Sequence, residues 1–306
     1  MSMRGIQASL ALGGLLLCGA WSGAWADERP EESFARGSAL LQKADFDGAL
    51  AALTAAANAA PENETYQREA LLVRRVIALR ERLTGEADAE AWGRIANSLY
   101  GFYQQRKIHG EALALAQRMH ERLHSAETAV MLARAQLDLG QDAAATTTLK
   151  QLPETQVTPA AKALLGIALA RQGRRDEAKA AAESLQLPEA PDAQLLFDAA
   201  RLRARLGENE SALDLLRRSL EQTPPSRLDA ARIAARESPD LAPLTSSEAF
   251  AVVLKTESQV KESGCSGGAS CAKCPSRATC SGESGPTKSQ EGACPEHPKD
   301  KKPEQP

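Results

Sequence analysis

Three glycines recur at a nearly constant spacing, and this period limits the fold more than any other feature of the chain. Gly140, Gly173 and Gly207 are 33 and 34 residues apart, and an alanine follows five residues after each. Each glycine stands between two stretches of helical apolar periodicity. A repeat of about 34 residues that reads as helix, turn and helix is the signature of a helical solenoid.

Composition supports an all-α fold and narrows the class of partner. The chain is rich in Ala, Leu, Arg and Glu, which are strong helix formers. Its formal net charge is only −3. Binding to nucleic acid or to a membrane surface needs a concentrated basic face, so we expect neither as the natural partner.

The first 26 residues have the pattern of a signal peptide. A basic start is followed by an apolar stretch over residues 6–18 and a small-x-small site at residues 24–26. An uncleaved anchor is the alternative, but this stretch is short for a hydrocarbon layer of about 30 Å. We therefore expect a mature chain that begins at Asp27, has no integral membrane span and resides in the periplasm or outside the cell.

Small residues at fixed places in the repeat predict how the helices pack. Counting from the glycines puts a small residue near the middle of each first helix and another at the start of each second helix. Small side chains let two helices approach closely, so units should stack through these faces. The expected close pairs are Ala133 with Ala145, Gly166 with Ala178, and Ala200 with Ala212.

In this register the chain resembles the tetratricopeptide repeat family. Residues 30–61 match its pattern best and residues 93–124 less well, and the resemblance extends loosely over residues 30–225. It implies a right-handed superhelical solenoid of helix-turn-helix repeats that mediates protein–protein interaction. The matching residues of the best unit are Gly37, Phe46, Ala49, Leu53, Ala56 and Pro61.

The expected organisation has four parts. The signal peptide precedes helical repeats over residues 27–225, which should be irregular around residues 62–90 because the stretch from Glu64 to Thr84 reads as one long helix. Capping helices over residues 226–258 should cover the last repeat, whose apolar face would otherwise be exposed. A flexible, disordered cysteine-rich tail over residues 259–306 completes the chain.

The resemblance also implies a peptide-binding groove. Positions of the first helix that face a bound peptide in this family carry four arginines and one aromatic residue. Guanidinium groups bind carboxylates in a bidentate manner, so we predict an acidic protein or peptide partner. Arginines that are merely solvated are the alternative. The predicted groove residues are Arg134, Arg171, Phe197, Arg201 and Arg205.

One pentapeptide matches a catalytic motif. His120, Glu121 and His124 fit H-E-x-x-H, in which two imidazoles bind zinc and the glutamate activates a water molecule. However, the segment falls at the end of the second helix of a repeat, Ser125 is placed to begin the next helix, and no third ligand is evident downstream. We therefore do not expect an enzyme, and a zinc metalloprotease is the weakest alternative.

The tail could bind a metal. Residues 261–306 contain no large apolar side chain, so only covalent or metal cross-links could order them. Zinc or copper binding, disulfide formation and a disordered tail remain open, whereas an iron–sulfur cluster does not fit an exported chain without a phosphate loop. A thiol-based metal-binding protein is the alternative to a scaffold. The candidate ligands are Cys265, Cys271, Cys274, Cys280, Cys294 and His297.

Overall fold

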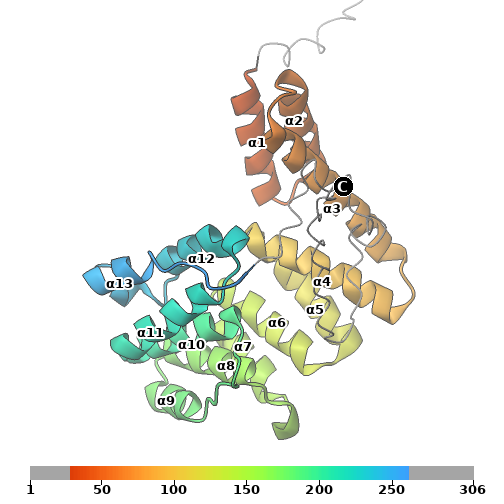
Figure 1. Cartoon of the computed structure of the whole chain (residues 1–306). Coiled ribbons are helices and arrows are strands. Elements are labelled where there is room, and N and C mark those ends of the chain that lie inside the picture. The colour runs from red at the N-terminus through yellow and green to blue at the C-terminus, as the bar shows by residue number, and fades with distance from the viewer. Residues whose placement is uncertain (1–27, 262–306) are drawn as a thin grey trace, which may run out of the picture. The chain divides into compact units, whose positions relative to one another are not determined.

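The computed structural model describes residues 28–261, and every regular element in that range is helical, which confirms the all-α class for this part of the chain (Figure 1). None of these helices is long and apolar enough to cross a membrane. The α-helices are α1 (Pro30–Gln42), α2 (Phe46–Ala59), α3 (Glu64–Gly85), α4 (Ala89–Gln105), α5 (His109–Leu123), α6 (Ala126–Asp138), α7 (Asp142–Lys150), α8 (Pro159–Arg171), α9 (Arg175–Glu183), α10 (Ala193–Leu206), α11 (Asn209–Glu221), α12 (Pro225–Glu237) and α13 (Glu248–Val253), with short 3₁₀ helices at η1 (Glu154–Gln156) and η2 (Ala242–Leu244).

Five helix hairpins make up most of the fold. They are α1–α2, α4–α5, α6–α7, α8–α9 and α10–α11, and the two helices of each pack against one another. The first helices of the last three hairpins also pack in sequence, α6 on α8 and α8 on α10. These three helices therefore present one continuous face, on which the predicted groove residues lie.

The turn within each hairpin contains one residue in the left-handed conformation at the same place. Gly140, Gly173 and Gly207 have φ angles of 70°, 76° and 84°. Ala44 and Lys107 occupy the equivalent turns of α1–α2 and α4–α5, with φ angles of 59° and 56°. The residue after each bonds back to a carbonyl five positions earlier, which closes the helix end in a Schellman motif. Glycine marks only three of these turns, although all five share the geometry.

The long helix predicted between the first hairpin and the later ones is confirmed. The sequence indicated Glu64 to Thr84, and α3 spans Glu64–Gly85. Its N-cap is Asn63, whose side chain accepts hydrogen bonds from the backbone of Thr65 and Tyr66. Within the described residues, α3 packs on α2 and α4 and has no hairpin partner. It therefore interrupts the regular spacing between the first hairpin and the later ones.

Small residues set the distance between neighbouring first helices. A Cβ atom at Gly166 of α8 would lie 2.7 Å from Cδ2 of Leu202 in α10. Ala133 of α6 and Ala200 of α10 occupy matching places and are fully buried, as are Ala178 and Ala212 in the second helices. The small residue in a first helix thus also serves the stacking of one hairpin on the next.

The C-terminal segment, residues 225–260, covers the last hairpin. Apolar side chains of α12, η2 and α13 join one core cluster with α10 and α11. Among them Leu228, Leu241, Leu244 and Phe250 are at most 5% exposed. The predicted capping region thus contains two α-helices that each contribute side chains to this core, although Ile233 of α12 and Val252 of α13 are exposed.

We expect Gly173→Ala to lower the free energy of unfolding by about 1–2 kcal/mol, because an L-residue is strained at φ 76°. No atom lies near the added methyl group, so backbone strain alone should cause the loss. Gly110→Ala, in the exposed first turn of α5 with equally open space, is the matched control and should be neutral or slightly stabilising. Equal effects in urea unfolding would contradict this account of the turn.

Candidate functional site

The structure brings the four predicted arginines together. Arg134 lies on α6, Arg171 ends α8, and Arg201 and Arg205 lie on α10. They gather around two buried carboxylates, Asp198 of α10 and Asp240 between α12 and η2. We call these six residues the arginine–aspartate cluster.

Asp240 is the centre of this cluster. Its side chain is 1% exposed. Arg171 binds this carboxylate in a bidentate manner, since Nε donates to Oδ1 and Nη2 donates to Oδ2, each at 2.8 Å. Arg201 Nε donates to Oδ2 at 2.9 Å, whereas Arg205 Nε is 3.8 Å from Oδ1. Asp240 is therefore fully engaged, with Arg205 as its most distant partner.

Asp198 extends the cluster to the preceding hairpins. It is fully buried, with Arg201 Nη1 at 3.1 Å from Oδ1 and Arg134 Nη1 at 2.7 Å from Oδ2. Arg171 also donates to the carbonyl oxygen of Leu137 at 2.7 Å. The cluster thus links α6, α8 and α10 with the C-terminal segment.

The charges of the cluster stabilise each other. Burial raises the pKa of Asp240, but hydrogen bonds from Arg171 and the charge of Arg201 outweigh it, so that the pKa lies below its ordinary value. An acidic ligand that binds these arginines must therefore compete with a well-held internal carboxylate.

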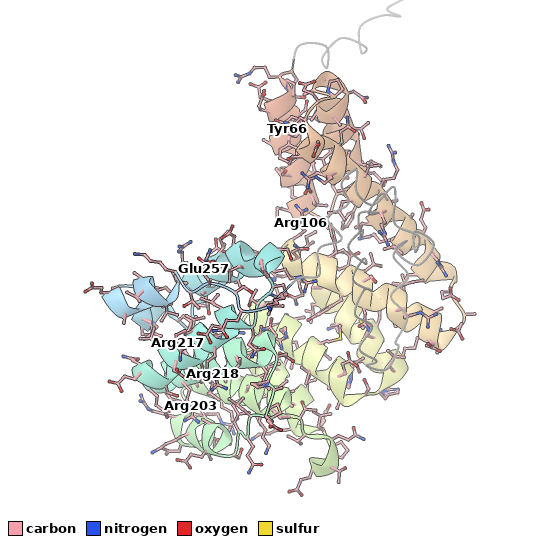
Figure 2. All side chains as sticks on the ribbon, in the orientation of Figure 1. Tyr66, Arg106, Arg203, Arg217, Arg218 and Glu257 are labelled. Atoms are coloured by element: carbon pink, nitrogen blue, oxygen red, sulfur yellow. The ribbon has the colours of Figure 1, made fainter. Side chains whose placement is uncertain are left out.

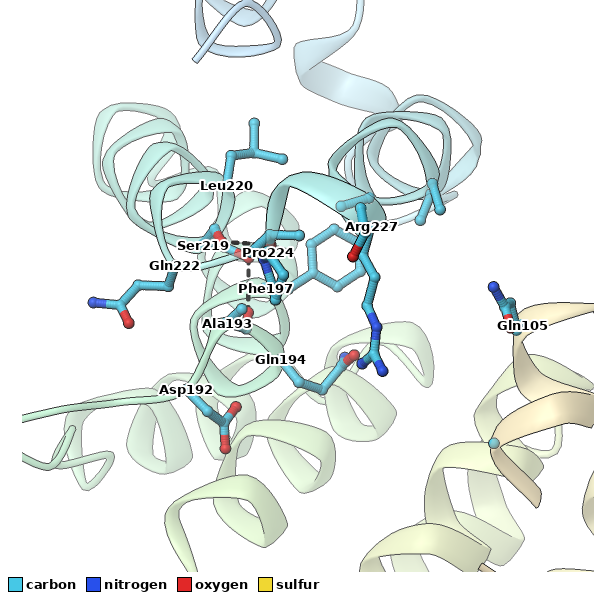
Figure 3. Close-up of a pocket in the computed structure, with 16 residues that line it drawn as sticks. Gln105, Asp192, Ala193, Gln194, Phe197, Ser219, Leu220, Gln222, Pro224 and Arg227 are labelled. Carbon is cyan, nitrogen blue, oxygen red and sulfur yellow. Dashed lines mark hydrogen bonds between the residues drawn. The ribbon is translucent and has the colours of Figure 1, made fainter. Parts of the chain in front are cut away.

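A groove of about 920 Å³ lies beside the cluster and is lined by Phe197, the fifth predicted residue (Figure 3). Its walls come from α4, from the start of α10, from the end of α11 and from α12. Figure 3 draws Gln194 and Phe197 from α10 and Arg227 from α12 among its lining residues, with Gln105 from α4 on the opposite wall. The groove therefore combines an aromatic surface with polar side chains.

Three side chains of this groove have no partner among residues 28–261. Gln105, Gln222 and Arg227 are exposed, and none makes a side-chain hydrogen bond or an ion pair within that range. Some arginines outside the groove have partners, as Arg217 of α11 (Figure 2) pairs with Asp214 and Glu221 of the same helix, whereas the exposed Arg236 of α12 has none within residues 28–261. The groove thus offers one guanidinium group and two amides to a ligand.

A smaller hollow of about 380 Å³ shares Phe197 and Ala234 with this groove. Among its lining residues, His109 Nδ1 and Ser238 Oγ are buried atoms without a hydrogen-bond partner in the described part of the chain. Buried polar atoms in folded proteins nearly always have a partner, which here would be water or a ligand.

The H-E-x-x-H segment lies at a helix end. Helix α5 ends at Leu123, and His124 is left-handed, with φ 46° and ψ 35°. His120 Nδ1 lies 3.3 Å from Thr128 Oγ1 at the start of α6, and burial, followed by the charge of His124, lowers the pKa of His120. Within residues 28–261, no three His, Cys, Asp or Glu side chains are grouped to hold a metal ion.

The remaining sequence predictions fall outside the described residues. Residues 1–26 lie outside the described range, so the signal peptide stays a prediction. The same holds for zinc or copper binding and for disulfide formation by the tail residues Cys265, Cys271, Cys274, Cys280, Cys294 and His297.

Comparison with known proteins finds no match from which a function could be carried over. No protein-family model matches the chain, and neither does any curated protein. The resemblance to tetratricopeptide repeats consequently rests on the residue pattern and on the hairpins described above.

We expect Asp240→Ala to destabilise the fold by about 3–5 kcal/mol in urea unfolding, because it leaves buried arginines without their counter-charge. Asp229→Ala is the matched control on α12, where Asp229 is 91% exposed and pairs with Arg232. Its loss should cost at most about 1 kcal/mol.

Since the folded pKa of Asp240 is lowered, its contribution to stability is present above the ordinary value of 3.8 and disappears as the pH falls through the folded pKa. The difference between the wild type and Asp240→Asn should shrink accordingly, and a constant difference would contradict this role.

We expect His124→Gly to raise the free energy of unfolding by on the order of 1 kcal/mol, because glycine adopts the left-handed conformation without strain. The same variant removes one imidazole of the H-E-x-x-H pattern. Its zinc content should equal that of the wild type when both are measured by elemental analysis. A loss of bound zinc in the variant would instead support a metal site.

Proposed function

We propose that this chain is an exported, tetratricopeptide-like scaffold that holds a protein partner in the groove beside Phe197. In this proposal the hairpins continue as a right-handed superhelical solenoid, and residues 1–26 direct export. The observation that carries the proposal is the groove itself, whose aromatic surface adjoins exposed amides and a guanidinium group without partners in residues 28–261. Such a surface suits an extended polypeptide, because side-chain amides bond its backbone and the ring packs on its side chains.

The chemistry of the lining favours binding over catalysis. The hydroxyl groups of Ser219 and Thr223 donate to the carbonyl oxygens of Ala193 and Ser219, at 2.7 Å in both cases. Asp192 accepts from the backbone of Leu195 as the N-cap of α10. These hydroxyl and carboxylate groups, which could act as nucleophiles or bases, form hydrogen bonds within the fold. The groups left for a ligand, the amides and the guanidinium group, suit recognition.

The proposal can be tested by crosslinking from the groove. A photoreactive amino acid at Gln222 or Ala230, introduced into the full chain in the cells that export it, should yield one adduct that mass spectrometry identifies. Position Arg236 is the control, since it lies on α12 but lines a different surface. Ala234→Trp, which fills the junction of the two hollows, should abolish the adduct while circular dichroism stays unchanged. Equal labelling from Arg236, or none from the groove, would refute the proposal.

A further inference from the structure

We infer that the segment held in this groove is extended and carries a carboxylate, and that Arg227 of α12 binds the carboxylate while Phe197 packs on an adjacent apolar side chain. The inference rests on the proposed function and specifies the partner's chemistry. It assigns the recognition of charge to the C-terminal segment, whereas the sequence pattern assigned it to the repeat helices.

The first argument is the distribution of charge. Three of the four predicted arginines are at most 17% exposed and hold internal aspartates, and the fourth, Arg205, flanks Asp240. Among residues 28–261, the charged side chains that line the groove are Arg227 and Asp192. Asp192 is occupied as an N-cap, whereas Arg227 is exposed and has no ion pair within residues 28–261. The charge left for a ligand is therefore positive, and a guanidinium group binds a carboxylate through two parallel hydrogen bonds.

The second argument is the arrangement of the lining. Arg227 of α12 and Phe197 of α10 both line this groove, and Figure 3 draws both side chains among its lining residues. A ligand that reaches both needs an acidic and an apolar group close together. Gln105 and Gln222 supply donors and acceptors on the flanking walls, which match the alternating N–H and C=O groups of an extended chain.

The third argument is the smaller hollow beyond Phe197. His109 and Ser238 line this hollow, which continues the groove past the aromatic ring, although His109 Nδ1 and Ser238 Oγ are themselves buried. Lys107 does not add charge to this end, because it pairs with Glu237. The hollow therefore gives an extended segment a path from Arg227 past Phe197.

The test uses fluorescence anisotropy on the full chain with three labelled octapeptides. The probes are Gly-Ser-Gly-Leu-Asp-Gly-Ser-Gly and the versions with Asn or Lys in place of Asp. We expect the Asp peptide to bind about tenfold more tightly than the Asn peptide, the effect of about one charge-assisted hydrogen bond, and the Lys peptide to bind least. The preference for Asp should weaken as salt is added.

Variants assign the effect to residues. Arg227→Ala should make the Asp and Asn peptides bind equally, and Phe197→Ala should weaken both by a similar factor. Arg236→Ala is the matched control on the same helix, outside the groove, and should leave all three affinities unchanged. A preference for Asp that survives Arg227→Ala would overturn the inference, as would equal binding of Asp and Asn peptides by the wild type or binding of neither.

The outcomes separate this inference from the proposed function. If the crosslink from Gln222 persists in Arg227→Ala and its adduct is held by a neutral or basic segment, the scaffold stands and the inference fails. If crosslinking from the groove also fails, the proposed function fails with it. A dimer in sedimentation of the chain alone that is lost in Arg227→Ala would place a second copy in the groove, which also overturns the inference.

Discussion

The burial of one carboxylate determines how the C-terminal segment is held against the last repeat hairpins. An ionised aspartate is costly to bury unless opposite charges and hydrogen bonds compensate it. Asp240 is 1% exposed and is held by Arg171 of α8 and Arg201 of α10, which belong to successive hairpins. Its place in the chain, three residues beyond the end of α12, means that fixing Asp240 also fixes α12 against α10. The groove depends on this contact, because α12 is one of its walls and α10 another.

Much of the fold could be predicted from the sequence because the repeat is a local property. The glycine period identified three hairpin turns, and each proved to be left-handed. The resemblance also implied helix-turn-helix units over residues 30–61 and 93–124, but not the left-handed residues Ala44 and Lys107, since neither indicates that conformation by its type. The long helix α3 was predictable because its apolar periodicity runs on without a turn signal.

The candidate site was predictable only in part, because pairing between distant residues leaves no local pattern. The register placed four arginines and Phe197 on one side, and the structure brings them together. Their partner Asp240 lies 69 residues from Arg171 and 39 from Arg201, in a short connection that reads as an ordinary loop. The H-E-x-x-H pattern shows the converse, since a local motif presumes a continuous helix and here crosses the end of α5.

These observations separate two uses of arginine, one on the first helices of the hairpins and one on the C-terminal segment. An arginine that is mostly buried must have its counter-charge in the same chain, since no mobile ligand can be relied on to offset its desolvation. Arg134, Arg171 and Arg201 meet that condition, and their aspartates hold the hairpins to the C-terminal segment. An arginine that stays exposed at the edge of a groove has no such requirement and keeps its charge for a ligand. Arg227 is placed in this way. Burial, more than position within the repeat, therefore decides which guanidinium groups hold the fold together and which are left to bind a partner.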